Sequence, residues 1–191
     1  LDKAAEFMRK AADKNIAWAK NELFDILWNI GTPESYKEMI SVVTEFAKAG
    51  DGGAMGRLGR AYRDGKGVEK DLDKAMEWMR KAKDKSRQWG SNLSEVLLTS
   101  SNKEDHNEAF LISSDLANRG DAEAMTLLSR MYREGIGIKK NSKKATEWIH
   151  EAANKNNRWA KEELTNINHE IFSKQKKKLV VFNAEHHSAL S

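Results

Sequence analysis

A segment of about 40 residues occurs twice in this chain, and this internal repeat limits most strongly what the chain can fold into. Residues 50–89 and 120–159 align without a gap, with about 18 identical positions in about 40. Most of the identical positions hold alanine, methionine, leucine, an aromatic residue or glycine. Such residues build packed helix pairs and carry no reactive group. The sequence therefore indicates a repeat architecture and says little about chemistry.

Each copy has the pattern of two helices joined by a glycine loop. In the first copy Asp51 is a suitable N-cap, Gly65 ends the first helix where a positive φ is expected, and Asp71 caps the second helix. Apolar residues follow at helical spacing in both helices. In the first copy these are Met55, Leu58 and Tyr62, then Ala75, Trp78, Met79 and Ala82; in the second they are Met125, Leu128 and Tyr132, then Ala145, Trp148, Ile149 and Ala152, with Asp121, Gly135 and Asn141 at the ends.

Residues 54–82 follow the pattern A-x-x-x-L-G-x-x-Y-x-x-G-x-G-V-x-x-D-x-x-K-A-x-x-W-x-x-K-A at nearly every place, and residues 124–152 depart from it at Ser129, Ile138, Asn141 and Glu151. This unit resembles the Sel1-like repeat, a relative of the tetratricopeptide repeat. The resemblance implies an all-α fold, a right-handed α/α superhelical solenoid of antiparallel helix pairs. It also implies a protein-interaction scaffold, and it implies no catalytic residue.

The remaining sequence extends the array. Residues 1–18 align with residues 72–89, so the chain starts on a second helix, and we expect a fragment of a longer array. Degenerate pairs without the glycine loop alternate with the regular ones, which gives a true period of about 35 residues. Thr32 with Pro33 is a good helix start, and Ser101 to Glu104 is a capping-box pattern. We expect ten helices in overlapping pairs, covering most of residues 2–175.

The end of the chain differs from the array. We assign residues 1–175 to the repeat array and residues 176–191 to a basic linker with a strand-like tail, because residues 179–182 (LVVF) have strand composition. A lone strand is unstable. Two explanations stay open: the first strand of a truncated α/β domain, or a tail that is disordered or pairs with another chain. In the first case residues 184–191 would lie at the carboxyl end of that strand, where open α/β sheets bind ligands.

Composition excludes several classes of function. Lys+Arg 33 against Asp+Glu 29 is too balanced to indicate nucleic-acid binding. The absence of cysteine excludes disulfides and thiolate metal sites, and because it is compatible with a reducing compartment we predict a cytoplasmic location. No apolar run approaches the roughly 18 residues of a membrane span. We predict a protein or peptide partner, no cofactor, no nucleic acid and no membrane span, and leave the oligomeric state open.

Aromatic and histidine residues give few candidate sites. Tryptophan recurs at repeat spacing (Trp18, Trp78, Trp89, Trp148, Trp159), so we predict core packing for this set, with Trp78 and Trp148 among the most buried residues. The adjacent pair His186 and His187 lies in an extended segment, where neighbours point to opposite sides, so we predict no metal site there. The sequence has no hydrolase, zinc-protease or phosphate-loop signature.

The candidate binding residues are arginines on the first helix of each regular pair. With the apolar residues of these helices packed inward, the arginines can project towards a groove, and arginine binds carboxylate or phosphate by two parallel hydrogen bonds. Two alternatives stay open: pairing with acidic residues of the neighbouring helix, which is the more ordinary outcome, or a groove for an acidic peptide or anionic ligand. The candidates are Arg57, Arg60, Arg63, Arg130 and Arg133.

Two functions from different classes fit these observations. The first is a protein-protein interaction scaffold. The second is an accessory repeat region of a larger enzyme, such as a transferase that builds bacterial cell-surface polymers, with the strand after Lys178 opening its catalytic domain. No catalytic residue is predicted within residues 1–191 in either case.

Overall fold

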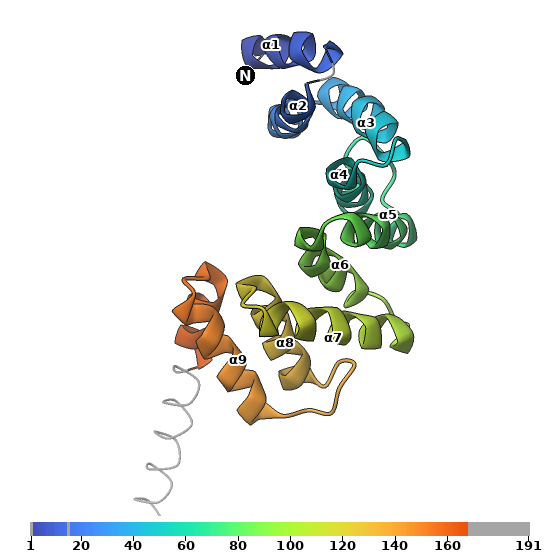
Figure 1. Cartoon of the computed structure of the whole chain (residues 1–191). Helices are drawn as coiled ribbons and strands as arrows, with labels where there is room; N and C mark the ends of the chain where they lie inside the picture. Colours follow the sequence, from blue (N-terminus) through green and yellow to red (C-terminus); the bar gives the residue numbers. More distant parts are fainter. Residues whose placement is uncertain (1, 15, 168–191) are drawn as a thin grey trace, which may run out of the picture. The chain divides into compact units, whose positions relative to one another are not determined.

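The computed structural model describes residues 2–14 and 16–167, and in this part of the chain the structure is helical without strands (Figure 1). A further helical stretch at residues 158–167 brings the α-helices in the described part to the ten expected. The predicted strand at residues 179–182, the His186–His187 pair and the proposed boundary at residue 176 lie outside the described residues. The labelled elements are α1 (Asp2–Asp13), α2 (Ala17–Ile30), α3 (Pro33–Lys48), α4 (Gly52–Asp64), α5 (Leu72–Lys85), the 3-10 turn η1 (Arg87–Trp89), α6 (Gly90–Leu97), α7 (Lys103–Asn118), α8 (Ala122–Glu134) and α9 (Ser142–Asn154).

The chain divides into two compact units, which are described separately: unit 1 is Leu1–Ile112 and unit 2 is Ser113–Ser191. In unit 1, each helix from α1 to α5 packs against the next α-helix in the sequence. In unit 2, α8 packs against α9. The first regular repeat copy is the pair α4–α5, and the second is the pair α8–α9.

The predicted caps and the glycine turn are confirmed in both copies. Asp51 Oδ1 accepts a hydrogen bond from the Ala54 amide at 2.7 Å, and Asp121 Oδ1 accepts one from Ala124 at 2.8 Å. Asp71 and Asn141 cap α5 and α9 in the same way. Gly65 and Gly135 end α4 and α8 with φ of 68° and 78°. Only glycine adopts this left-handed conformation without strain, which is why both copies carry it.

The start of α7 differs from the prediction. The capping box at Thr32 is present, with Ser35 as its partner. The expected box from Ser101 to Glu104 is wrong, because the cap is Asn102, whose Oδ1 accepts a hydrogen bond from the Glu104 amide at 3.0 Å. The Ser100 hydroxyl accepts from the Asn102 amide at 3.0 Å and donates to Asp105 at 2.7 Å. Asparagine is as strong an N-cap as serine, so the helix begins one residue later than expected.

The paired helices approach each other through small residues. A Cβ atom built on Gly59 of α4 would lie 2.7 Å from Met79 Cγ and 3.1 Å from the Ala75 carbonyl oxygen of α5. The second copy has Ser129 at this position, and its hydroxyl donates a 2.7 Å hydrogen bond to the Ala145 carbonyl oxygen, the counterpart of Ala75. The contact is therefore kept in both copies, by the absence of a side chain in one and by a hydrogen bond in the other.

The prediction that tryptophan fills the core is wrong in part. Trp78, Trp89 and Trp148 are half-buried, while Met79 and Ile149, next to two of them, are 0% exposed. The interior stripe of α5 and α9 runs through alanine and this Met or Ile position, so the indoles lie at its edge. Trp18 and Trp159 are 62% and 44% exposed.

One helix position accounts for the difference between Trp89 and Trp159. A Cβ atom on Gly56 of α4 would overlap the indole ring of Trp89, so the absence of a side chain lets this ring lie against the helix. In the second copy Thr126 stands at the position of Gly56. Its side chain takes the space that glycine leaves open, and Trp159, the counterpart of Trp89, is the more exposed ring.

The Gly56 contact gives a first prediction. Gly56→Ala should lower the free energy of unfolding by about 1–3 kcal/mol, because the added methyl carbon would lie 2.0 Å from Cδ2 of the Trp89 ring, which must then shift. A Cβ atom on Gly53, on the same helix, would lie 3.1 Å from Oδ1 of the capping residue Asp51, 3.3 Å from Arg57 and 3.7 Å from Asn21, so it needs a much smaller shift. Gly53→Ala should therefore cost less stability than Gly56→Ala. Chemical denaturation of both variants measures the difference; equal midpoints would mean that Trp89 does not pack on Gly56.

The position of the core stripe gives a second prediction. Met79→Ala should cost about 2–5 kcal/mol, because it leaves a cavity at a site that is 0% exposed. Trp78→Ala should cost less, although it removes more atoms, because the ring is half in solvent. Thermal melting of the two variants provides the comparison, and a larger loss for Trp78→Ala would place the indole, and not Met79, in the core.

Candidate functional site

A row of aromatic side chains in unit 1 forms the base of the candidate site. Phe24 and Trp28 lie one turn apart on α2, with ring centroids 5.5 Å apart. Tyr36, in the first turn of α3, meets Trp28 edge-on with centroids 6.4 Å apart. Phe24 is buried against the core, whereas Trp28 and Tyr36 are half-buried and present part of their rings to the surface. Helical spacing on α2 and the tight turn into α3 thus bring the three rings together.

Basic side chains lie over these rings. The Arg60 guanidinium carbon is 4.2 Å from the centre of the Trp28 ring, and Lys66 Nζ is 4.0 Å from the same centre. Arg57 lies 5.2 Å from the ring centre of Phe24. Contacts of this kind contribute about 0.5–1 kcal/mol each at exposed sites. With Lys20, whose Nζ is 3.6 Å from the ring centre of Phe46, they form what we call the cation–aromatic surface: Lys20, Phe24, Trp28, Tyr36, Phe46, Arg57, Arg60 and Lys66.

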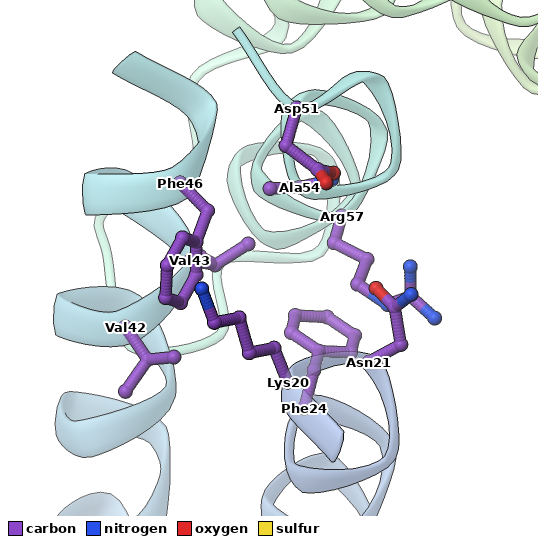
Figure 2. A pocket seen from close by; sticks show the side chains of 9 residues that line it. All are labelled: Lys20, Asn21, Phe24, Val42, Val43, Phe46, Asp51, Ala54 and Arg57. Atoms are coloured by element: carbon purple, nitrogen blue, oxygen red, sulfur yellow. The ribbon is translucent and has the colours of Figure 1, made fainter. Parts of the chain in front are cut away.

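A small hollow lies at one end of this surface, between α2, α3 and the start of α4 (Figure 2). In this view Lys20 and Arg57 lie on either side of Phe24. The hollow has a volume of about 20 Å³, which is room for about one water molecule. The cation–aromatic surface is therefore suited to contact with another surface, and this hollow is too small for a small-molecule ligand.

The predicted arginines divide into two groups. In the first group, side chains pair with acidic residues of another helix, as the first alternative predicted. Arg57 reaches Asp25 at 3.4 Å, Arg63 reaches Glu95 at 3.0 Å, and Arg133 contacts Glu163. The hydrogen bond that Arg63 donates to the Asp64 carboxylate raises the pKa of Arg63. Burial is the largest single effect on the pKa of Arg133 and lowers it, but the hydrogen bonds and negative charges of Glu163 and Glu134 together raise that pKa above its ordinary value. These guanidinium groups are already engaged within the fold.

The second group is Arg60 and its repeat counterpart Arg130. Arg60 has a loose ion pair, 3.9 Å from Asp64 one turn along α4, in addition to its contact with Trp28. Arg130 Nε is buried and has no hydrogen-bond partner among the residues that the structure describes. Arg57, Arg60 and Arg63 belong to unit 1, and Arg130 and Arg133 belong to unit 2. The structure therefore places each set within its own unit.

The sequence analysis missed the aromatic half of the site. Trp28 carries two of the five cation–ring contacts of this surface, but it lies outside the two repeat copies, so a search for residues that the copies share passes over it. The signal that could have found it is the aromatic spacing on α2, where Trp28 follows Phe24 by one helical turn.

A repeated ion pair in unit 1 was also missed. Arg9 Nη2 of α1 donates to Glu38 of α3 at 2.7 Å, and Arg80 Nη2 of α5 donates to Glu108 of α7 at 2.7 Å. The two pairs stand at equivalent positions of consecutive repeats. The hydrogen bond to Glu108 raises the pKa of Arg80. Each ion pair links the second helix of one helix pair to the second helix of the next helix pair. The role of these ion pairs is therefore structural.

Within residues 2–14 and 16–167, no group of three or more His, Asp or Glu side chains lies close enough to hold a metal ion. In the same part of the chain, every helix is too short or too polar to cross a membrane.

The comparisons with known proteins agree with the repeat analysis. The Sel1 repeat family model matches residues 1–16, 52–86 and 122–157, which include α1 and both regular pairs. These three regions are therefore Sel1 repeats, as the sequence pattern predicted. Such repeats generally act as scaffolds for protein-protein interaction. Neither this match nor the structural likenesses described next support the alternative of an accessory region of an enzyme.

Two solved structures resemble this one. A Sel1 repeat protein from Oxalobacter formigenes superimposes with a TM-score of 0.64 and 23% identity, over 78% of this chain and 63% of that one. A protective antigen of uropathogenic Escherichia coli strains, described as displaying an SLR fold, gives 0.56 and 19%, over 78% and 40%. This chain thus spans less than two thirds of either protein. At these identities the likeness shows the fold, an α/α solenoid of antiparallel helix pairs, which confirms the predicted fold class.

Proposed function

We propose that this protein is an interaction scaffold whose cation–aromatic surface receives an acidic segment of a partner protein. The observation that carries the proposal is the position of Arg60 and Lys66, which both lie over the ring of Trp28. Arg60 has only a loose ion pair at 3.9 Å within the described residues. Its guanidinium is thus held in place by the ring and keeps hydrogen-bonding capacity for a carboxylate.

Physical chemistry supports this choice of ligand. A guanidinium stacked on a ring keeps its in-plane N–H groups directed outward, and these groups bind a carboxylate by two parallel hydrogen bonds. Because the ring already restricts the side chain, less conformational entropy is lost on binding. Tryptophan, tyrosine and arginine are also the residues that most often dominate the affinity of protein interfaces. Half-buried Trp28 and Tyr36 supply apolar area beside the cations.

The test replaces Arg60 and its counterpart Arg130 together by alanine. The probe is a fluorescent peptide of alternating glutamate and glycine, and binding is followed by fluorescence anisotropy. The double variant should bind the peptide roughly tenfold more weakly, which corresponds to a loss of about 1.4 kcal/mol. Its melting temperature should fall by no more than about 4 °C, because the lost interactions are the Arg60 contact with Trp28 and a loose ion pair with Asp64.

The matched control is Arg63→Ala with Arg133→Ala. This variant removes the same charge from the same two helices, but these arginines contact Glu95 and Glu163, so it should lose more stability and less affinity. If both double variants weakened peptide binding equally, the loss of affinity would come from the change in net charge alone. A lower melting temperature with unchanged binding in the Arg60 and Arg130 variant would make these two residues structural. Either result would contradict the proposal.

A further inference from the structure

The two repeat copies differ beside a tryptophan that they share. On α5, Lys81 Nζ lies 4.6 Å from the centre of the Trp78 ring and donates a 2.6 Å hydrogen bond to Glu77. On α9, Glu147 and Trp148 stand at the positions of Glu77 and Trp78, but Glu151 replaces Lys81. Among the described residues no lysine or arginine lies over the Trp148 ring. The second copy therefore keeps the ring and the carboxylate and has exchanged their cation for a second carboxylate.

A groove opens at this place in unit 2. It has a volume of about 340 Å³ and lies between α8, α9 and the C-terminal part of α7, with Glu147, Trp148 and Glu151 in its lining. This size is within the range of pockets that hold ligands. Tyr132 and Lys144 also line it, and Lys144 Nζ lies 5.3 Å from the ring centre of Tyr132. The same contact occurs in the first copy between Lys74 and Tyr62, at 5.4 Å, so the exchange at position 151 is the specific change.

We propose that this groove, the Trp148 groove, binds a lysine or arginine side chain of a partner protein. The cation would lie over the indole and donate hydrogen bonds to Glu147 and Glu151, as Lys81 does to Glu77 in the first copy. The first copy thus shows the occupied form of the site, filled by a residue of its own helix. The inference goes beyond the proposed function, because it assigns a basic ligand to unit 2, separate from the acidic ligand of unit 1.

The site can be tested through the indole N–H resonance of Trp148, identified in the NMR spectrum by its loss in Trp148→Phe. The probe is a short peptide of alternating lysine and glycine. It should shift this resonance in a saturable way, and a peptide of glutamate and glycine should not. Glu151→Lys recreates the lysine of the first copy, so the groove would hold its own cation and the apparent affinity should fall roughly tenfold. Glu69→Lys, an equal charge change at an exposed loop residue of unit 1, should leave the response unchanged.

The reciprocal variant keeps the test independent of any damage at α9. Lys81→Glu removes the cation from the first copy, and the Trp78 resonance should then respond to the lysine peptide. The ion pair that it breaks is exposed, so the fold should be retained. No gain at Trp78, or equal weakening by Glu151→Lys and Glu69→Lys, would overturn the proposal.

Two other occupants would also overturn it. A Trp148 shift that grows with protein concentration alone would mean that a second copy of this chain fills the groove. Deletion of residues 173–191 tests the lysine-rich segment of this chain as the occupant. If the deletion shifted the Trp148 resonance in the direction opposite to the peptide shift and by the same amount, that segment would be the occupant. A saturable peptide response that is independent of protein concentration and survives this deletion would support a partner protein.

Discussion

The close approach of paired helices at alanine and glycine is the contact on which the rest of this structure depends. Ala61, Ala75 and Ala82 are 0% exposed, and Gly59 has no room for a side chain beside the Ala75 carbonyl. Because the Ala75 carbonyl and the Met79 side chain of α5 lie directly against Gly59, neither helix can slide without a clash. The glycine turn, the capping residues and the position of the larger side chains all follow from this fixed spacing. Repeat proteins gain their stability from such local contacts between neighbours.

The shared core leaves the surface open to change. The two copies conserve the contact between helices, but Glu151 stands where the first copy has Lys81, and Trp28 lies outside both copies. Neither the exchange at position 151 nor Trp28 involves the small residues that hold the pairs together. Each copy can therefore present different chemistry on the same backbone. Unit 1 presents cations over aromatic rings, and unit 2 presents the carboxylates of Glu147 and Glu151 around the indole of Trp148.

Features that depend on residues close together in the sequence were predicted correctly, and features that depend on contacts between helices were not. Caps such as Asp51 and the turn at Gly65 depend on residues at most a few positions away, so the helices were predictable. The burial of a tryptophan depends on the residue that faces it: Trp89 and Trp159 share a motif, yet Gly56 admits one ring and Thr126 does not admit the other.

The candidate site shows the same limit. The arginines of α4 were identified, but the partners that separate Arg63 from Arg60 come from other helices, Glu95 in one case and Trp28 in the other. Amide hydrogen exchange of the whole chain tests the central claim most directly. The account predicts that the amides of Ala61 and Ala82, and of their counterparts Met131 and Ala152, are among the slowest to exchange, because all four residues are 0% exposed where paired helices meet. Exchange at these amides as fast as in the first turn of α4 would mean that the pairs open locally, and would contradict the account.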